Sequence, residues 1–165
     1  MKPNNTISQR RIERIKEQGY FNFSNYEIAQ IAFGNRFAYI VCTIVLIYGV
    51  VSASVPVLMA MLLIAFGGVV LPNHPFDYIY NYVIRHMLKK PKLPQRSKQL
   101  KFACSIATCF IAITIFLFDD NYMTAGYVVG ANLLFSAVLV STTDICIPSI
   151  LYNKLLINNK KGTQK

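Results

Sequence analysis

The residues best suited to chemistry lie where two long apolar stretches end. His74 and Asp77 follow one stretch, and Asp144 and Cys146 follow the other. Imidazole, carboxylate and thiolate groups can bind a metal ion or transfer a proton. If both stretches end on the same side of the molecule, these four side chains meet there. They are therefore candidate functional residues.

A structural role fits the same positions. The polar side chains of residues 73–77 are suited to capping the helix that follows them. The chain has two histidines, and His86 lies in a basic stretch, so a catalytic zinc site is not expected. We expect no catalytic residue, no metal and no cofactor; whether the chain is an enzyme stays open, and a non-enzymatic role is favoured.

Polar and small residues inside the apolar stretches give a second set of candidates. Asn132 lies near the centre of one stretch, where it can contact a solute or hydrogen-bond another helix. Gly126 and Gly130 are four residues apart and predict a packing face, within the chain or between copies. The apolar stretches contain no formal charge, which weighs against a proton-driven carrier.

The elements that carry these residues are predicted to be membrane-spanning helices. Of the 165 residues, 54% are hydrophobic and only 15% are charged, whereas a soluble domain has about 25% charged residues. Because about 20 apolar residues cross a bilayer, the stretches allow four spans. These spans cover about residues 36–53, 55–71, 102–118 and 122–144.

A weak internal repeat predicts how the spans are arranged. Arg36-Phe37-Ala38 opens the first half, and Lys101-Phe102-Ala103 opens the second. Because each half holds two spans, both halves enter the membrane from the same face. The expected fold is all-α: a membrane-spanning bundle of four helices built as two parallel helical hairpins, with short cytoplasmic interfacial helices.

Three short helices are expected on the membrane surface. One covers residues 6–18, beginning near Thr6. A second follows the capping pair Ser24 and Glu27 and stops at Gly34. The third covers residues 77–88. The predicted parts are thus an N-terminal segment (1–35), a transmembrane domain (36–157) with a basic loop (72–101), and a basic tail (158–165).

The 17 lysines and arginines predict the orientation. All of them precede or open the first span, lie between the second and third spans, or follow the fourth span, so the positive-inside rule places both termini in the cytoplasm. Asp119 and Asp120 lie in the turn on the opposite side, where we expect them to cap the fourth span.

The expected partners are the bilayer, anionic lipid headgroups, and a second copy or a larger membrane complex. Nucleic acid is not expected, because the loop over residues 89–96 has no aromatic residue for stacking.

Several motifs together resemble a known bacterial membrane family. They are His74-Pro75, Lys101-Phe102-Ala103 and Cys146 near the end of the fourth span. The chain is similar over about residues 32–156 to the family of domain of unknown function 4395, which implies a bacterial inner membrane and no established activity. Many members carry a Cys-x-x-Cys pair where this chain has Cys146 and Ser149. A single thiol can form a mixed disulfide but cannot close an internal one.

Two function classes follow from these features. The first is a non-enzymatic membrane module, meaning a scaffold, an assembly factor or a subunit of a transport complex. It predicts self-association through the Gly126 and Gly130 face. The second is a thiol- or sulfur-handling membrane protein that uses Cys146. It predicts that a thiol reagent labels Cys146 faster than Cys104.

Overall fold

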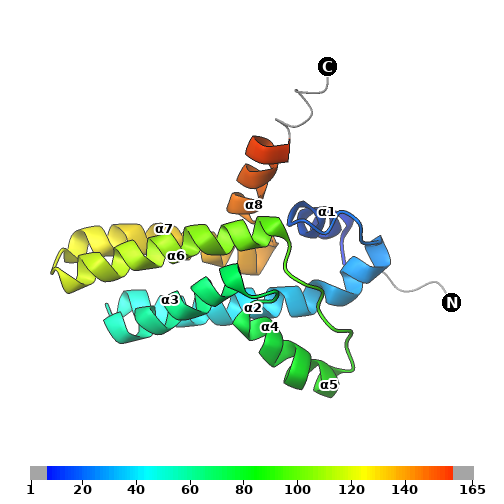
Figure 1. The fold of residues 1–165 in the computed structure, drawn as a ribbon, viewed down its shortest axis with the longest axis horizontal. Coiled ribbons are helices and arrows are strands. Elements are labelled where there is room, and N and C mark those ends of the chain that lie inside the picture. The colour runs from blue at the N-terminus through cyan, green and yellow to red at the C-terminus, as the bar shows by residue number, and fades with distance from the viewer. Residues whose placement is uncertain (1–6, 158–165) are drawn as a thin grey trace.

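Four long helices form the body of the protein (Figure 1). The structure is a computed structural model that describes residues 7–157, and over that range its regular elements are helices, with no strand. The long helices are α2 (Asn25–Val51), α3 (Val55–Val70), α6 (Lys98–Asp119) and α7 (Met123–Thr143). They close a ring in which α3 packs on α6, α6 on α7, α7 on α2, and α2 on α3. The predicted all-helical class is confirmed.

Tight turns join the two helices within each pair. Ala53 has a positive φ of 47° between α2 and α3, and Pro56 lies in the first turn of α3, where its missing N–H has no helical partner to lose. Asn121 has a φ of 62° between α6 and α7. The expected cap by Asp119 and Asp120 is wrong: Tyr122 is the N-cap of α7, and no side chain caps that end.

The first long helix begins earlier than predicted. Ser24 and Glu27 form the expected capping box, but α2 then continues without a break to Val51, so the predicted stop at Gly34 is wrong. Gly34 instead lies in the middle of α2 and lets the helix approach the Tyr80 ring closely, because a Cβ atom on Gly34 would lie 2.5 Å from that ring. Helix α6 also starts early, at Lys98, where the Ser97 hydroxyl accepts a hydrogen bond from the Leu100 N–H.

The short helices gather around one end of the long ones, which we call the basic end (Figure 1). Helix α1 (Gln9–Glu17) buries Ile12 and Ile15 there, and its N-cap is Ser8, while the predicted start at Thr6 lies outside the described residues, as does the tail 158–165. The other short elements are α4 (Pro75–Ile79), the π-helical η1 (Tyr80–Ile84), α5 (Arg85–Leu88), α8 (Ile147–Tyr152) and the π-helical η2 (Asn153–Ile157).

The two halves share the form of these short elements. Pro75 lies in the first turn of α4, and Pro148 lies in the first turn of α8. Each of these α-helices passes into a π-helical segment, η1 in the first half and η2 in the second. The weak sequence repeat therefore has a counterpart in the local structure of both halves.

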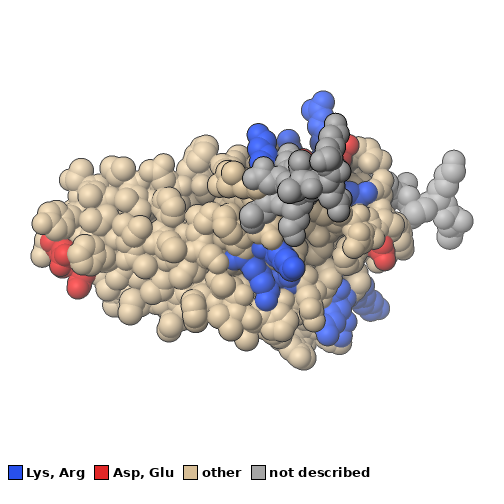
Figure 2. All heavy atoms as spheres, turned by 45° about the horizontal axis from the view of Figure 1, so that its top comes forward, with Lys and Arg blue, Asp and Glu red and all other residues tan. Residues whose placement is uncertain are grey.

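Charge and apolar surface are separated along the long axis. Figure 2 shows Lys and Arg at the basic end, an acidic tip at the α6–α7 turn, and a broad surface without charge between them. Between the two ends, large apolar side chains of the long helices are exposed, among them Ile44 (61%), Leu63 (70%), Phe116 (62%) and Phe135 (66%). Helices α2, α6 and α7 are long and apolar enough to cross a membrane, and α3 adds a fourth candidate if it is joined to residues 75–88, from which it is bent by 80°.

The two glycines of α7 pack against helices of the same chain. A Cβ atom on Gly126 would lie 2.5 Å from Cδ1 of Phe118 in α6. One on Gly130 would lie 2.8 Å from Cγ1 of Val50 in α2. Both glycines therefore bring α7 close to its neighbours, and their face is covered within the chain.

This packing predicts that Gly130→Leu destabilises the single chain. The new side chain must displace Val50, which we expect to lower the free energy of unfolding by about 1–3 kcal/mol. Thermal unfolding in mild detergent measures the change, with Ala131→Leu at the exposed neighbouring position as the control. An unfolding midpoint for Gly130→Leu equal to that of the control would contradict the packing seen here.

Candidate functional site: a buried polar network at the basic end

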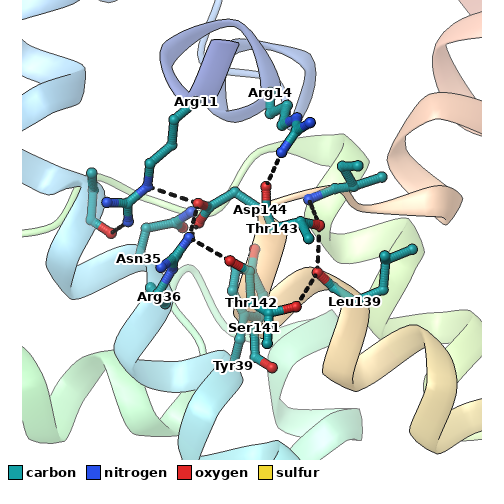
Figure 3. A network of polar contacts seen from close by, with 12 residues as sticks. Arg11, Arg14, Asn35, Arg36, Tyr39, Leu139, Ser141, Thr142, Thr143 and Asp144 are labelled. Carbon is teal, nitrogen blue, oxygen red and sulfur yellow. Dashed lines mark hydrogen bonds and ion pairs between the residues drawn. The ribbon is translucent and has the colours of Figure 1, made fainter. Parts of the chain in front are cut away.

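The first centre of the network is the carboxylate of Asp144. Asp144 follows the last residue of α7, has a φ of 60°, and is fully buried. Arg11 from α1 donates its Nε–H to Oδ2 at 2.7 Å, and Arg36 from α2 contacts both carboxylate oxygens (Figure 3). One carboxylate thus connects the end of α7 to α1 and α2, whose arginines lie more than 100 positions earlier in the sequence.

The same arginines and their neighbours also satisfy the end of α7. Arg14 donates to the carbonyl of Thr143 at 2.9 Å, and Arg36 donates to the carbonyl of Thr142 at 3.0 Å (Figure 3). Carbonyls in the last turn of a helix lack partners within the helix and carry partial negative charge. The cations therefore stabilise the end of α7 as well as the carboxylate that follows it.

The second centre is a buried pair between Asp77 and Arg96. Asp77 lies in α4, and Arg96 lies in the loop before α6; they are 1% and 7% exposed. The guanidinium donates to both carboxylate oxygens, at 2.5 and 2.7 Å, and to the Tyr39 hydroxyl at 3.1 Å. Burial lowers the pKa of Arg96, but the Asp77 carboxylate outweighs that effect, and the pKa stays well above its ordinary value. Arg96 is therefore charged, and its pair with Asp77 holds the basic loop against α4.

Gln18 joins the two centres. Its side-chain amide donates to the carbonyl of Asp144 at 2.8 Å. Its Oε1 accepts from the Tyr39 hydroxyl at 3.1 Å and from the Asn35 amide at 2.9 Å. The network therefore runs without a break from Asp77 through Arg96, Tyr39 and Gln18 to Asp144.

The network includes residues that the sequence did not single out. Asp77 and Asp144 were predicted candidates, whereas Gln18, Tyr39 and the arginines were not. The arginines carried a signal only as part of the basic segments, where they were assigned to topology and lipid headgroups. Their pairing with Asp77 and Asp144 depends on contacts over as many as 133 positions in the chain, which no local pattern shows.

His74 caps α4 and is held in one neutral form. Its Nδ1 accepts the backbone N–H of Phe76 at 3.3 Å, and the backbone N–H of His74 donates to the Asp77 carboxylate at 3.1 Å. Burial, and secondarily the charge of Arg96, lower the pKa of His74 to about 4, so the ring is neutral near pH 7. Because Nδ1 accepts, the proton lies on Nε2, which is 3.9 Å from the sulfur of Cys42.

A cavity of about 490 Å³ lies beside the network, between α2, α3, α6 and α7. Its lining includes His74, Arg96 and three of the four cysteines, namely Cys42, Cys104 and Cys146.

Cys146 is 8% exposed and accepts a hydrogen bond from the Ser149 hydroxyl at 3.1 Å. Burial raises the pKa of the Cys146 thiol against the opposing effect of Ser149. The thiol is therefore protonated, and in this state it is a poor nucleophile.

The remaining candidates lie apart from the network. Asn132 is exposed at the edge of the cavity and donates to the carbonyl of Val128 in its own helix at 2.8 Å. Gly126 and Gly130 lie in the half of α7 nearer the acidic tip. Among residues 7–157, no three His, Cys, Asp or Glu side chains come close enough together to hold a metal ion.

These features define an all-helical protein with several candidate membrane spans and a buried polar network at one end. The chain belongs to the family described as domain of unknown function (DUF4395), whose profile matches residues 33–156. The resemblance predicted from the sequence is thereby confirmed. No curated protein and no solved structure matches the chain.

The buried pair makes Asp77→Asn a destabilising substitution. Arg96 would keep its charge without a carboxylate partner, so we expect a loss of about 3–5 kcal/mol in the free energy of unfolding. Thermal unfolding in mild detergent measures the loss, and Asp119→Asn at the exposed acidic tip is the matched control. The double variant Asp77→Asn/Arg96→Gln should recover part of the stability, because no unpaired charge remains. Equal midpoints for Asp77→Asn and the control would contradict the pairing.

Proposed function

We propose that this chain is a multi-pass protein of the bacterial inner membrane, with both termini and the basic loop in the cytoplasm. The proposal is supported by the exposed apolar middle surface and by the position of the lysines and arginines at one end of the long axis (Figure 2). In this arrangement α2, α3, α6 and α7 cross the bilayer as two hairpins that enter from the same face. The network of Asp77 and Asp144 then lies at the cytoplasmic border.

The second crossing needs a specific account, because α3 has 16 residues. At 1.5 Å per residue it spans about 24 Å, which is less than the hydrocarbon thickness of about 30 Å. After the bend, residues 75–88 expose Ile79, Tyr82, Val83 and Met87. This combination of exposed apolar residues and tyrosine suits the headgroup region, so we assign these residues to the membrane surface.

Within the membrane the protein acts as a non-enzymatic module: a scaffold, an assembly factor or a subunit of a transport complex. One observation carries this assignment. The buried acidic and guanidinium groups of the described residues, Asp77, Arg96 and Asp144, are all engaged in ion pairs. Groups held in this way stabilise a fixed cytoplasmic surface, and they are poorly placed to exchange protons or to bind a charged solute.

Reporter fusions test the orientation. A phosphatase that is active only outside the cytoplasm should be inactive when fused after Lys165 and active when inserted in the turn at residues 119–122. A cytoplasmic reporter at the same two sites should give the opposite pattern. Phosphatase activity after Lys165 would contradict the proposed topology.

Affinity purification in mild detergent tests the assignment as a module. The tagged chain should purify with a second copy of itself or with other membrane proteins in a fixed ratio. Disruption of the cytoplasmic surface by Asp144→Asn should reduce that recovery, whereas Asp120→Asn at the opposite end should not. Recovery of the wild-type chain as an isolated monomer under every mild condition would contradict the assignment.

A thiol- or sulfur-handling role is the second candidate, because Cys42, Cys104 and Cys146 line one cavity. Such a role requires a reactant that is soluble in the membrane, since the lining is mostly apolar. We expect Cys146→Ala to fail to complement a deletion strain, while Cys109→Ala at an exposed position outside the cavity keeps normal function. Full function of Cys146→Ala in the complemented deletion strain would eliminate this role.

A further inference from the structure

The cavity is built to accept an apolar molecule. Its inner wall is formed by buried apolar residues of the helix core, including Leu46, Met61 and Ile111. On α6 the lining extends from Leu100 to Ile111, which corresponds to about 16 Å of helix. A volume of about 490 Å³ lies within the range of about 300–1,000 Å³ typical of small-molecule sites.

The cavity opens toward the apolar surface between α6 and α7. Phe110 and Phe135 at its edge are 37% and 66% exposed, and Ile147 and Leu151 of α8 are 46% and 44% exposed at its basic end. In the proposed orientation this opening faces the hydrocarbon of the inner leaflet. A lipid-soluble molecule can therefore enter sideways from the bilayer without passing through water.

The inner polar end of the cavity presents a hydrogen-bond donor without net charge. The Nε2–H of His74 has only a weak acceptor nearby, the Cys42 sulfur at 3.9 Å. Arg96 also reaches the cavity, but its charge is neutralised by the bidentate contact with Asp77. An anionic head group would therefore meet little attraction here, whereas a carbonyl oxygen would accept the imidazole N–H.

We propose that this cavity binds an uncharged lipid with an apolar chain and a carbonyl-bearing head group, with the carbonyl oxygen hydrogen-bonded to Nε2 of His74. Quinones and diacylglycerols share this chemistry. The chain lies along α6 and α7, and the head group lies beside the three cysteines. The site gives the proposed membrane module a lipid-soluble ligand, and it also offers the reactant that a thiol-handling role requires.

Binding of short-chain probes to the full chain in mild detergent tests the site. The probes are a decyl-substituted benzoquinone, dioctanoylglycerol, and dodecylbenzene as an analogue without a carbonyl group. Native mass spectrometry should show saturable binding of one molecule of carbonyl probe per chain. Thermal unfolding should show a higher midpoint when the probe is bound. The carbonyl probe with the lower dissociation constant identifies the source, quinone or glyceride.

Three variants connect binding to the cavity. Ala107→Phe fills the cavity from α6 and should weaken binding of the carbonyl probes at least tenfold, whereas Ala112→Phe, exposed on the same helix and outside the cavity, should leave it unchanged. His74→Asn keeps a helix-capping side chain but loses the Nε2–H. It should weaken the carbonyl probes about three- to tenfold and leave dodecylbenzene unaffected. If Ala107→Phe has a lowered unfolding midpoint, Ser136→Phe at the opening replaces it.

Several results would overturn the proposal. They are no saturable binding of either carbonyl probe to the wild-type chain, equal binding to Ala107→Phe and Ala112→Phe, and unchanged carbonyl binding to His74→Asn. Laurate serves as a fourth, anionic probe. Tighter binding of laurate than of both carbonyl probes would also overturn the proposal, because the ligand would then be anionic. The inference rests on the proposed membrane placement, which the reporter fusions test separately, so the failure of one can be distinguished from failure of the other.

Discussion

Asp144 imposes the main electrostatic constraint on this structure, because its carboxylate is removed from water at the point where the last long helix ends. An isolated charge in such a position costs many kcal/mol. Arg11 and Arg36 compensate it from α1 and α2, with side chains that are 23% and 26% exposed. The N-terminal segment must therefore fold back onto the helix ends, which explains why α1 packs beside residues more than 100 positions away.

The Asp77–Arg96 pair repeats this logic in the first half of the chain, and Gln18 joins the two. Side chains in such a network have discrete partners, so the arrangement specifies one geometry rather than a range of similar ones. The apolar faces of the four long helices contribute less to this specificity, because the hydrophobic effect is non-directional. We infer that the polar network sets the register of the two hairpins at the basic end, while the glycines of α7 set their spacing nearer the acidic tip.

The sequence predicts the long helices well, because uncharged stretches of this length leave few alternatives. It fails where a tertiary contact overrides a local signal. Gly34 is a helix terminator by local rules, yet the Tyr80 ring fills the space above it and α2 continues. Asp119 and Asp120 have the composition of a cap, but α7 starts at Met123 with no side-chain cap.

The candidate site shows the same division. His74, Asp77 and Asp144 were identifiable from type and position, and the helix-capping alternative for residues 73–77 describes the geometry of His74 and Asp77. The roles of Gln18 and Arg96 were not predictable, since an isolated glutamine and a basic loop residue have many surface uses. The cavity was also hidden, because its lining comes from several helices whose residues share no sequence motif.

The short length of helix α3 has a mechanical consequence. Helices α6 and α7 have 22 and 21 residues, whereas α3 has 16. In a bilayer, lipid beside α3 must compress to match it, while lipid beside α6 and α7 keeps nearly its full thickness. The protein would then produce a one-sided dimple in the membrane, and neighbouring proteins with similarly short spans would reduce the elastic cost by gathering on that side.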